Sequence, residues 1–182
     1  HGRYRHRRWG QYRSELALGG GAVATTHLKI TNAREYFDEI AFPDFGEANA
    51  NPASLRYAFH CASSLYHLHE FVFAEHKSAL NFKKARDFDR ELCEKSGDFK
   101  LIRDIANTAK HMELDRDPQR ITHIANTAVQ STSYGEGNYG AGPWGGGQRV
   151  RIHVGPNSYE EFSHVATKVM SMWQSMFAEN GW

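Results

Sequence analysis

The C-terminal stretch of the chain has an apolar repeat that suits an amphipathic helix. Large apolar side chains recur every three or four residues, at Phe162, Val165, Val169, Met172, Trp173 and Met176. This period places them on one face of an α-helix. Ser158–Glu161, directly ahead of the repeat, matches a capping box, in which the side chains satisfy the first backbone N–H groups of a helix. The sequence therefore predicts a helix from residue 158 that buries Trp173, against the rest of the molecule or against a second copy of the chain.

The same period occurs in four upstream segments, which are separated by residues that start or stop helices. We expect these helices at residues 26–42, 51–76, 82–95 and 98–116. Pro43 is expected to end the first, Asn51 and Asp98 to cap the second and fourth, and Gly97 to follow the third. The predicted fold class is therefore mainly α, a four- to five-helix antiparallel bundle.

The pattern changes between the fourth and the last helix. Residues 121–132 are rich in Thr, Ile and Val, and residues 149–154 alternate polar and apolar side chains, as strands do. Between them, residues 135–147 contain too much glycine for a helix or a strand, and we expect them to be mobile. We predict a small β-hairpin with a Gly-rich loop, at about residues 120–155, appended to a single helical domain of residues 26–182.

Composition limits the classes of partner. The 182 residues have a net charge of +1, so the whole molecule has no bulk preference for nucleic acid or membranes. No apolar run approaches the ~18 residues that span a bilayer, so no membrane partner is expected. The two cysteines, Cys61 and Cys93, lie far apart in the sequence, which favours reduced thiols. No apolar segment follows the N-terminal charges as in a signal peptide, so a cytoplasmic location is expected by default.

The N-terminal segment 1–25 is basic and rich in glycine. Five arginines precede its first acidic residue, Glu15, and Tyr4, Trp9 and Tyr12 lie among them. Guanidinium groups bind phosphate and aromatic rings stack on bases, so this composition suits RNA. The same composition is also typical of a solvated tail or of residues left from cloning.

The 11 histidines do not form a metal motif. His60, His67, His69 and His76 lie on the second predicted helix, but no two of them are four residues apart. Glu70 follows His67 by three residues, which is a weak metal signal by itself. The glycine-dense stretch lacks the phosphate-loop pattern GxxxxGK[ST], and no GxSxG nucleophile motif occurs. We therefore expect neither a metal nor a cofactor.

The fourth predicted helix contains the candidate site. Arg103, Asn107 and His111 are spaced by four and form one polar ridge, with Lys110 beside it, opposite an apolar stripe of Leu101, Ile105 and Met112. An arginine holds a phosphate, a histidine exchanges a proton, and an asparagine orients ring or substrate, so this set suits metal-independent phosphodiester cleavage. The alternative is that the ridge faces solvent or a partner and has no chemical role.

Residues 107–111, Asn-Thr-Ala-Lys-His, at the end of this helix resemble the motif of the HEPN superfamily, whose members are small helical bundles that include metal-independent ribonucleases. The family motif has an arginine, then a polar residue, with a histidine five positions after the arginine. Asn107 and His111 match, whereas Ala106 occupies the arginine position. The resemblance covers about residues 27–115. It implies a helical bundle, a homodimer with both motifs facing the interface, and contact with RNA.

Two functions follow from these expectations. The first is a non-catalytic helical interaction module of the HEPN-like type, which the absence of arginine at Ala106 favours. The second is a metal-independent RNase or nucleotide-directed toxin or defence enzyme, with His111 as acid and base, Asn107 as orienting group, and Arg103 and Lys110 as phosphate ligands.

Overall fold

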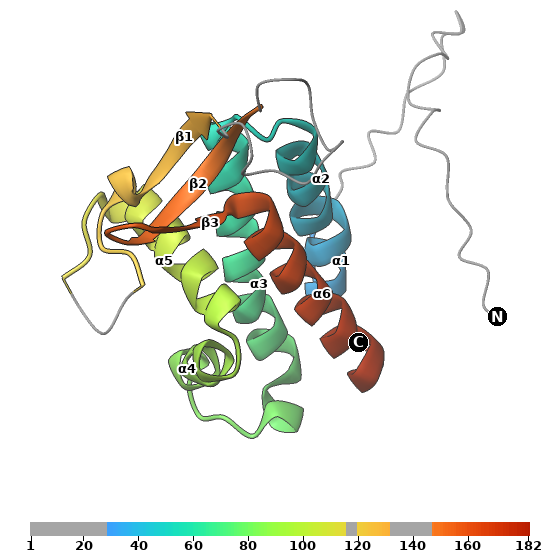
Figure 1. Cartoon of the computed structure of the whole chain (residues 1–182). Helices are drawn as coiled ribbons and strands as arrows, with labels where there is room; N and C mark the ends of the chain where they lie inside the picture. Colours follow the sequence, from blue (N-terminus) through green and yellow to red (C-terminus); the bar gives the residue numbers. More distant parts are fainter. Residues whose placement is uncertain (1–28, 116–119, 132–146) are drawn as a thin grey trace, which may run out of the picture.

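A computed structural model gives the structure of residues 29–115, 120–131 and 147–182 (Figure 1). The described helices are α1 (Ala33–Tyr36), α2 (Phe42–Ala50), α3 (Leu55–Leu80), α4 (Ala85–Lys95), α5 (Gly97–His111) and α6 (Phe162–Asn180), with the π-helical turn η1 (Phe37–Ala41) and the 3-10 turn η2 (Ile124–Asn126). The described strands are β1 (Thr127–Ser131), β2 (Gln148–Gly155) and β3 (Ser158–Glu161), and they form one antiparallel sheet in the order β1-β2-β3. The mainly α class is confirmed. The segment 1–25 and the glycines from 135 to 146 lie outside the described residues.

The sheet covers one end of the helical bundle (Figure 1). The backbone N–H of Val150 in β2 donates to the Pro52 carbonyl, 2.8 Å away, just ahead of α3. At the opposite end the ring of His76, near the end of α3, stacks on Trp182, just past α6, with centroids 4.2 Å apart. Consequently α6 runs parallel to α3, whereas α5 runs antiparallel to it. Because α5 ends and α6 begins at the end of the bundle that the sheet covers, α6 also runs antiparallel to α5.

The core lies among α3, α5 and α6, and Trp173 is at its centre. This side chain is fully buried, its Nε1–H donates to the Leu65 carbonyl at 3.0 Å, and its ring meets Phe99 edge-on with centroids 5.9 Å apart. The hydrogen bond satisfies the only polar atom of the indole, so the ring is buried without a desolvation penalty for that atom. The prediction that Trp173 is buried is confirmed.

The first helix does not end at Pro43, so that prediction is wrong. The chain continues through α1, η1 and α2 to Ala50 without a break. In η1 the N–H of Phe42 donates to the Phe37 carbonyl, five residues back. A proline ring within a regular α-helix collides with the carbonyl four residues earlier. The wider π-helical turn directly ahead of Pro43 relieves this collision, and the proline stands in the first turn of α2, where its missing N–H is least costly.

Serine side chains cap two helices for which we expected other residues. Ser54 Oγ accepts from the Tyr57 N–H at 3.4 Å, and Ser96 Oγ accepts from the Phe99 N–H at 3.1 Å. Asn51 instead ends α2, since its N–H donates to the Glu47 carbonyl. Gly97 is the first residue of α5, and Asp98 lies in that helix's first turn rather than at its cap. Serine is as good a cap as asparagine or aspartate, so the sequence alone did not distinguish these positions.

Residues 158–161 form a strand rather than a capping box. They pair with β2, with Tyr159 opposite His153 and Glu161 opposite Arg151. The Glu161 carboxylate accepts from Arg149 at 3.0 Å and from the Ser163 hydroxyl at 2.9 Å, and no side chain caps α6. The predicted hairpin of β1 and β2 is present, but β3 extends it to three strands. This third strand satisfies the outer edge of β2, which would otherwise expose unpaired backbone groups.

We expect Trp173→Ala to lower the free energy of unfolding by about 3–5 kcal/mol, because it leaves a cavity at the centre of the core. Chemical denaturation followed by circular dichroism measures this change. Ser171→Ala, an exposed position on the same helix, is the matched control and should change stability by less than about 0.5 kcal/mol. Equal effects of the two substitutions would contradict the central place of the indole.

Candidate functional site

The polar ridge on α5 passes from the protein interior to the surface. The Arg103 side chain is only 15% exposed, and Asn107 is half-buried. Lys110 and His111, in the last turn of α5, are exposed. The helical period places the residues one turn apart, as the spacing requires. Burial divides the ridge into an inner part, Arg103 and Asn107, and an outer part, Lys110 and His111.

Asp104 neutralises the inner cation of the ridge. Its carboxylate is buried, and its Oδ1 accepts from Arg103 Nε at 3.1 Å and from Arg103 Nη2 at 2.9 Å. Its Oδ2 accepts from the backbone N–H of Arg120 at 2.7 Å. Burial raises the pKa of the Asp104 carboxyl, although the Arg120 N–H and the Arg103 guanidinium oppose that rise. Arg103 is therefore engaged in an intramolecular ion pair rather than directed at solvent.

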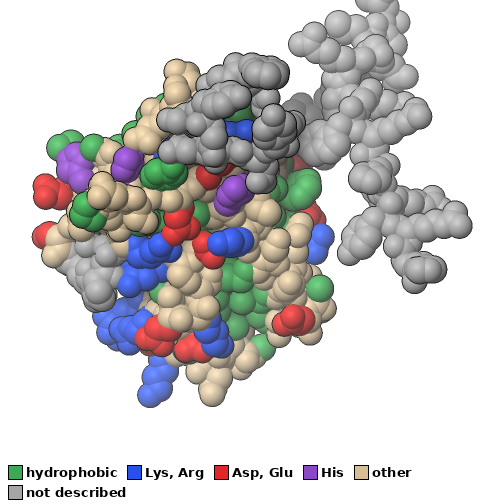
Figure 2. Space-filling view, in the orientation of Figure 1, with side chains coloured by type: hydrophobic (Ala, Val, Ile, Leu, Met, Phe, Trp, Pro, Cys, Tyr) green, Lys and Arg blue, Asp and Glu red, His purple; other side chains and the backbone are tan. Residues whose placement is uncertain are grey.

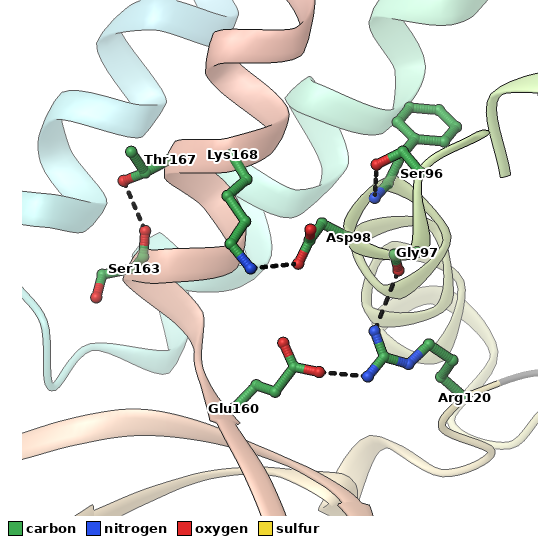
Figure 3. A network of polar contacts seen from close by, with 9 residues as sticks. Ser96, Gly97, Asp98, Arg120, Glu160, Ser163, Thr167 and Lys168 are labelled. Atoms are coloured by element: carbon green, nitrogen blue, oxygen red, sulfur yellow. Dashed lines mark hydrogen bonds and ion pairs between the residues drawn. The ribbon is translucent and has the colours of Figure 1, made fainter.

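Arg120 extends this network to the sheet, as Figure 3 shows. Its Nη1 donates to the Gly97 carbonyl at 3.3 Å, and its Nη2 is paired with the Glu160 carboxylate of β3. Close by, Lys168 of α6 reaches Asp98 of α5 at 3.4 Å. The start of α5 is thereby joined to the sheet by one contact and to α6 by another.

Asn107 lies at the contact between α5 and α3. Its side chain is close to the Tyr66 hydroxyl of α3. Burial is the main cause that raises the pKa of the Tyr66 phenol, and the nearby Asp89 carboxylate adds to it. The Tyr66 ring lies 6.0 Å from Phe99, between centroids. Asn107 and Phe99 of α5 therefore both face Tyr66 of α3.

The chain leaves α5 through a strained turn at Met112. This residue has φ 64° and ψ −45°, and the Glu113 N–H donates to the His111 carbonyl at 2.7 Å, which is a γ-turn. Its side chain is 61% exposed, so the prediction that Met112 joins the buried stripe of Leu101 and Ile105 is wrong. The helix has ended at His111. A non-glycine residue with such angles costs about 1–3 kcal/mol, and strain of this kind is common at functional sites.

Sequence reasoning missed three residues of this network, Asp104, Tyr66 and Arg120. Asp104 had a signal, because it stands next to Ile105 and three residues after Leu101, on the apolar side of the helix. A carboxylate in that position needs a buried partner. The partner atom, a backbone N–H sixteen residues further along, had no signal in the sequence.

The histidines and cysteines of the described residues do not form a metal site. Within residues 29–115, 120–131 and 147–182, no group of three or more metal-binding side chains occurs. His67 Nδ1 lies 3.6 Å from Glu70, and His69 is buried with its Nδ1 2.6 Å from the Tyr66 carbonyl. Cys61 and Cys93 are free thiols; burial is the main cause that raises the pKa of each, for Cys93 to about 12. Neither thiol has the lowered pKa of a nucleophile.

The described surface has no dominant charge on the face in Figure 2, where acidic side chains lie among the basic ones. No helix within the described ranges is both long and apolar enough to cross a membrane. These features define a mainly α protein with a small three-stranded sheet and a polar ridge on α5. Comparison with protein-family models, curated proteins and solved structures gives no match.

We expect Asp104→Ala to destabilise the fold by about 3–5 kcal/mol, because it leaves the buried Arg103 guanidinium unpaired and removes the acceptor of the Arg120 N–H. Denaturant unfolding measures the loss. Asp98→Ala on the same helix is the matched control, and it should cost less than about 1 kcal/mol because the Asp98–Lys168 pair is partly exposed. If Asp104→Ala were as mild as the control, the network would have no structural role.

Proposed function

We propose that the protein is a non-catalytic helical interaction module of the HEPN-like type, which acts as a homodimer in the cytoplasm. The observation that carries this proposal is the ion pair of Arg103 with the buried Asp104 carboxylate. A ribonuclease of this kind needs a cation that is free to hold the scissile phosphate. The only arginine of the ridge is occupied, and a phosphate that approached it would also be repelled by Asp104.

The state of Asn107 supports the same function. Its amide is half-buried beside the Tyr66 hydroxyl of α3, so in this arrangement it faces a neighbouring helix rather than a substrate. Both inner residues of the ridge thus have structural partners, and the outer residues Lys110 and His111 are the ones that another molecule can reach. The two free thiols support a reducing compartment.

The exposed end of α5 supports a second copy of the chain as the partner. Met112 presents an apolar side chain to water, and the exposed Lys110 and Glu113 on either side of it have opposite charges. A two-fold symmetric interface brings the same patch together from both subunits. Lys110 of each copy then faces Glu113 of the other, and the two methionines meet between them. This arrangement also brings both His111 side chains to the interface, as the family resemblance implies.

A metal-independent ribonuclease is the second candidate. The exposure of Lys110 and His111 favours it, because a dimer would place two cations and two imidazoles beside each other. The Arg-rich segment 1–25 would add affinity for RNA. The two candidates differ in one measurable property, which is cleavage.

We expect the purified full chain to leave single-stranded and hairpin RNA intact, with or without a chelator, because the ridge on α5 has no free arginine to hold the phosphate. Gel electrophoresis of labelled RNA measures the fraction that is cleaved. Cleavage that persists in chelator and is lost in His111→Ala would contradict the non-catalytic function and favour the ribonuclease. His60→Ala, an exposed histidine on α3, is the matched control for loss of an imidazole.

We expect Met112→Gly to weaken the dimer by about 100-fold or more, because both subunits lose the side chain and each buried methionine contributes ~1.5–3 kcal/mol. Glycine tolerates the positive φ of this position, so the substitution removes the side chain without straining the turn. Analytical ultracentrifugation measures the dissociation constant.

Charge reversal gives an independent test of the same interface. Lys110→Glu alone should weaken the dimer, because it places two acids opposite each other, and Lys110→Glu with Glu113→Lys should restore it. A wild-type protein that remains monomeric at high micromolar concentration would contradict the dimer. A dimer that all of these variants leave unchanged would place the interface elsewhere.

A further inference from the structure

A pocket of about 600 Å³ opens on the sheet, at the start of β1 and the end of β2. Its walls are formed by parts of residues 120–130 and by residues 153–156. The space exists because Ala125, Ala128 and Gly155 have little or no side chain there. Its volume is in the range of about 300–1,000 Å³ that small-molecule sites occupy.

The polar side chains of this pocket are all able to donate hydrogen bonds. They are Arg120, Thr122, Asn126, Gln130 and His153, and none of the described residues that line the pocket is acidic. A set of donors without a carboxylate stabilises an anion or an oxygen-rich group and disfavours a cation. The lining therefore favours anionic or oxygen-rich ligands over cationic ones.

Two of these donors are held in place by contacts within the molecule. The Arg120 guanidinium is fixed between the Gly97 carbonyl and Glu160. The Asn126 Oδ1 accepts from the His123 N–H at 2.9 Å, so the group that Asn126 offers to a ligand is its Nδ2 amide. Donors that are fixed before binding lose little conformational entropy when the ligand arrives.

Gln130 and His153 form the third polar element. The two side chains extend from neighbouring strands, and the Gln130 amide nitrogen contacts His153 Nε2. The donor and acceptor roles in this contact depend on the tautomer of the ring, and Nδ1 is the ring nitrogen that remains for a ligand. The contact with Gln130 thereby holds the ring of His153 in place.

We propose that this pocket binds a small metabolite through a phosphate or carboxylate group. The anionic group is bound by His153 and Asn126, and the small apolar residues at the wall accommodate a compact body. The site is separate from the ridge on α5, but the two are joined. The Met112 carbonyl accepts from the Ile124 N–H at 2.8 Å, and the Leu114 N–H donates to the Thr122 carbonyl at 2.7 Å.

Titration of the full chain with inorganic phosphate, with acetate and with uncharged glucose tests this proposal. Backbone amide signals in nuclear magnetic resonance report binding residue by residue. We expect saturable shifts at Ala125, Asn126 and Gly155 with phosphate or acetate and none with glucose. Shifts with phosphate alone identify a phosphate ligand, and shifts with acetate alone identify a carboxylate. The absence of saturable shifts with both anions, or equal shifts with glucose, would overturn the proposal.

Three variants distinguish binding in the pocket from non-specific attraction of anions to surface cations. His153→Ala should weaken the binding of the anion about tenfold, as expected for one lost hydrogen bond to a charged group. Ala128→Ile should also weaken it, because the added atoms fill the pocket while all five donors remain and the β-branched side chain suits a strand. Lys83→Ala, an exposed cation near the start of α4, should leave it unchanged. The pocket would not be the binding site if Lys83→Ala weakened anion binding as much as His153→Ala. It would also not be the site if Ala128→Ile left anion binding unchanged, with a circular dichroism spectrum that matches the wild type.

Discussion

The connection between the helical bundle and the sheet depends on the contacts of the buried Asp104 carboxylate. A carboxylate without water needs partners for both oxygens, and here one oxygen takes the Arg103 guanidinium while the other takes the Arg120 N–H. The second contact brings the chain back to α5 after residue 115 and fixes where it enters the 3-10 turn and β1. The side chain of Arg120 then reaches Glu160 on β3, so the contacts of Asp104 and Arg120 join α5 to the segment before β1 and to β3.

The same contact explains why the ridge has two parts with different properties. The guanidinium that compensates Asp104 is withdrawn from solvent, and Asn107 is half-buried beside Tyr66 of α3, so the inner part faces the protein interior. The outer part ends in the γ-turn at Met112, whose backbone pairs with the segment that lines the pocket on the sheet. Both proposed binding surfaces therefore adjoin the connection between α5 and β1, where the fold has strain and exposed polar groups rather than a closed core.

Local patterns in the sequence identified the helices whose apolar residues recur regularly every three or four positions. The apolar repeats located α3, α4, α5 and most of α6, and placed Trp173 in the core. The sequence was ambiguous where the same segment is compatible with two secondary structures. Ser158–Glu161 fits a capping box and an edge strand equally well, and the choice depends on whether β2 has a free edge, which no local pattern reveals. For the ridge, spacing gave the common face of Arg103, Asn107 and His111, but their exposure depends on Tyr66 and Arg120, which are distant in the sequence.

The direct passage from β3 to α6 has a mechanical consequence. β3 ends at Glu161 and α6 begins at Phe162, with no intervening residue to absorb a change. One residue added at this junction would rotate the helix by about 100° relative to the strand. Trp173 would then turn from Leu65 toward solvent, so the pairing of two short strands determines which side of α6 enters the core. The sheet therefore fixes the rotation of α6 about its own axis. An insertion or deletion at this junction should destabilise the fold far more than one in a surface loop.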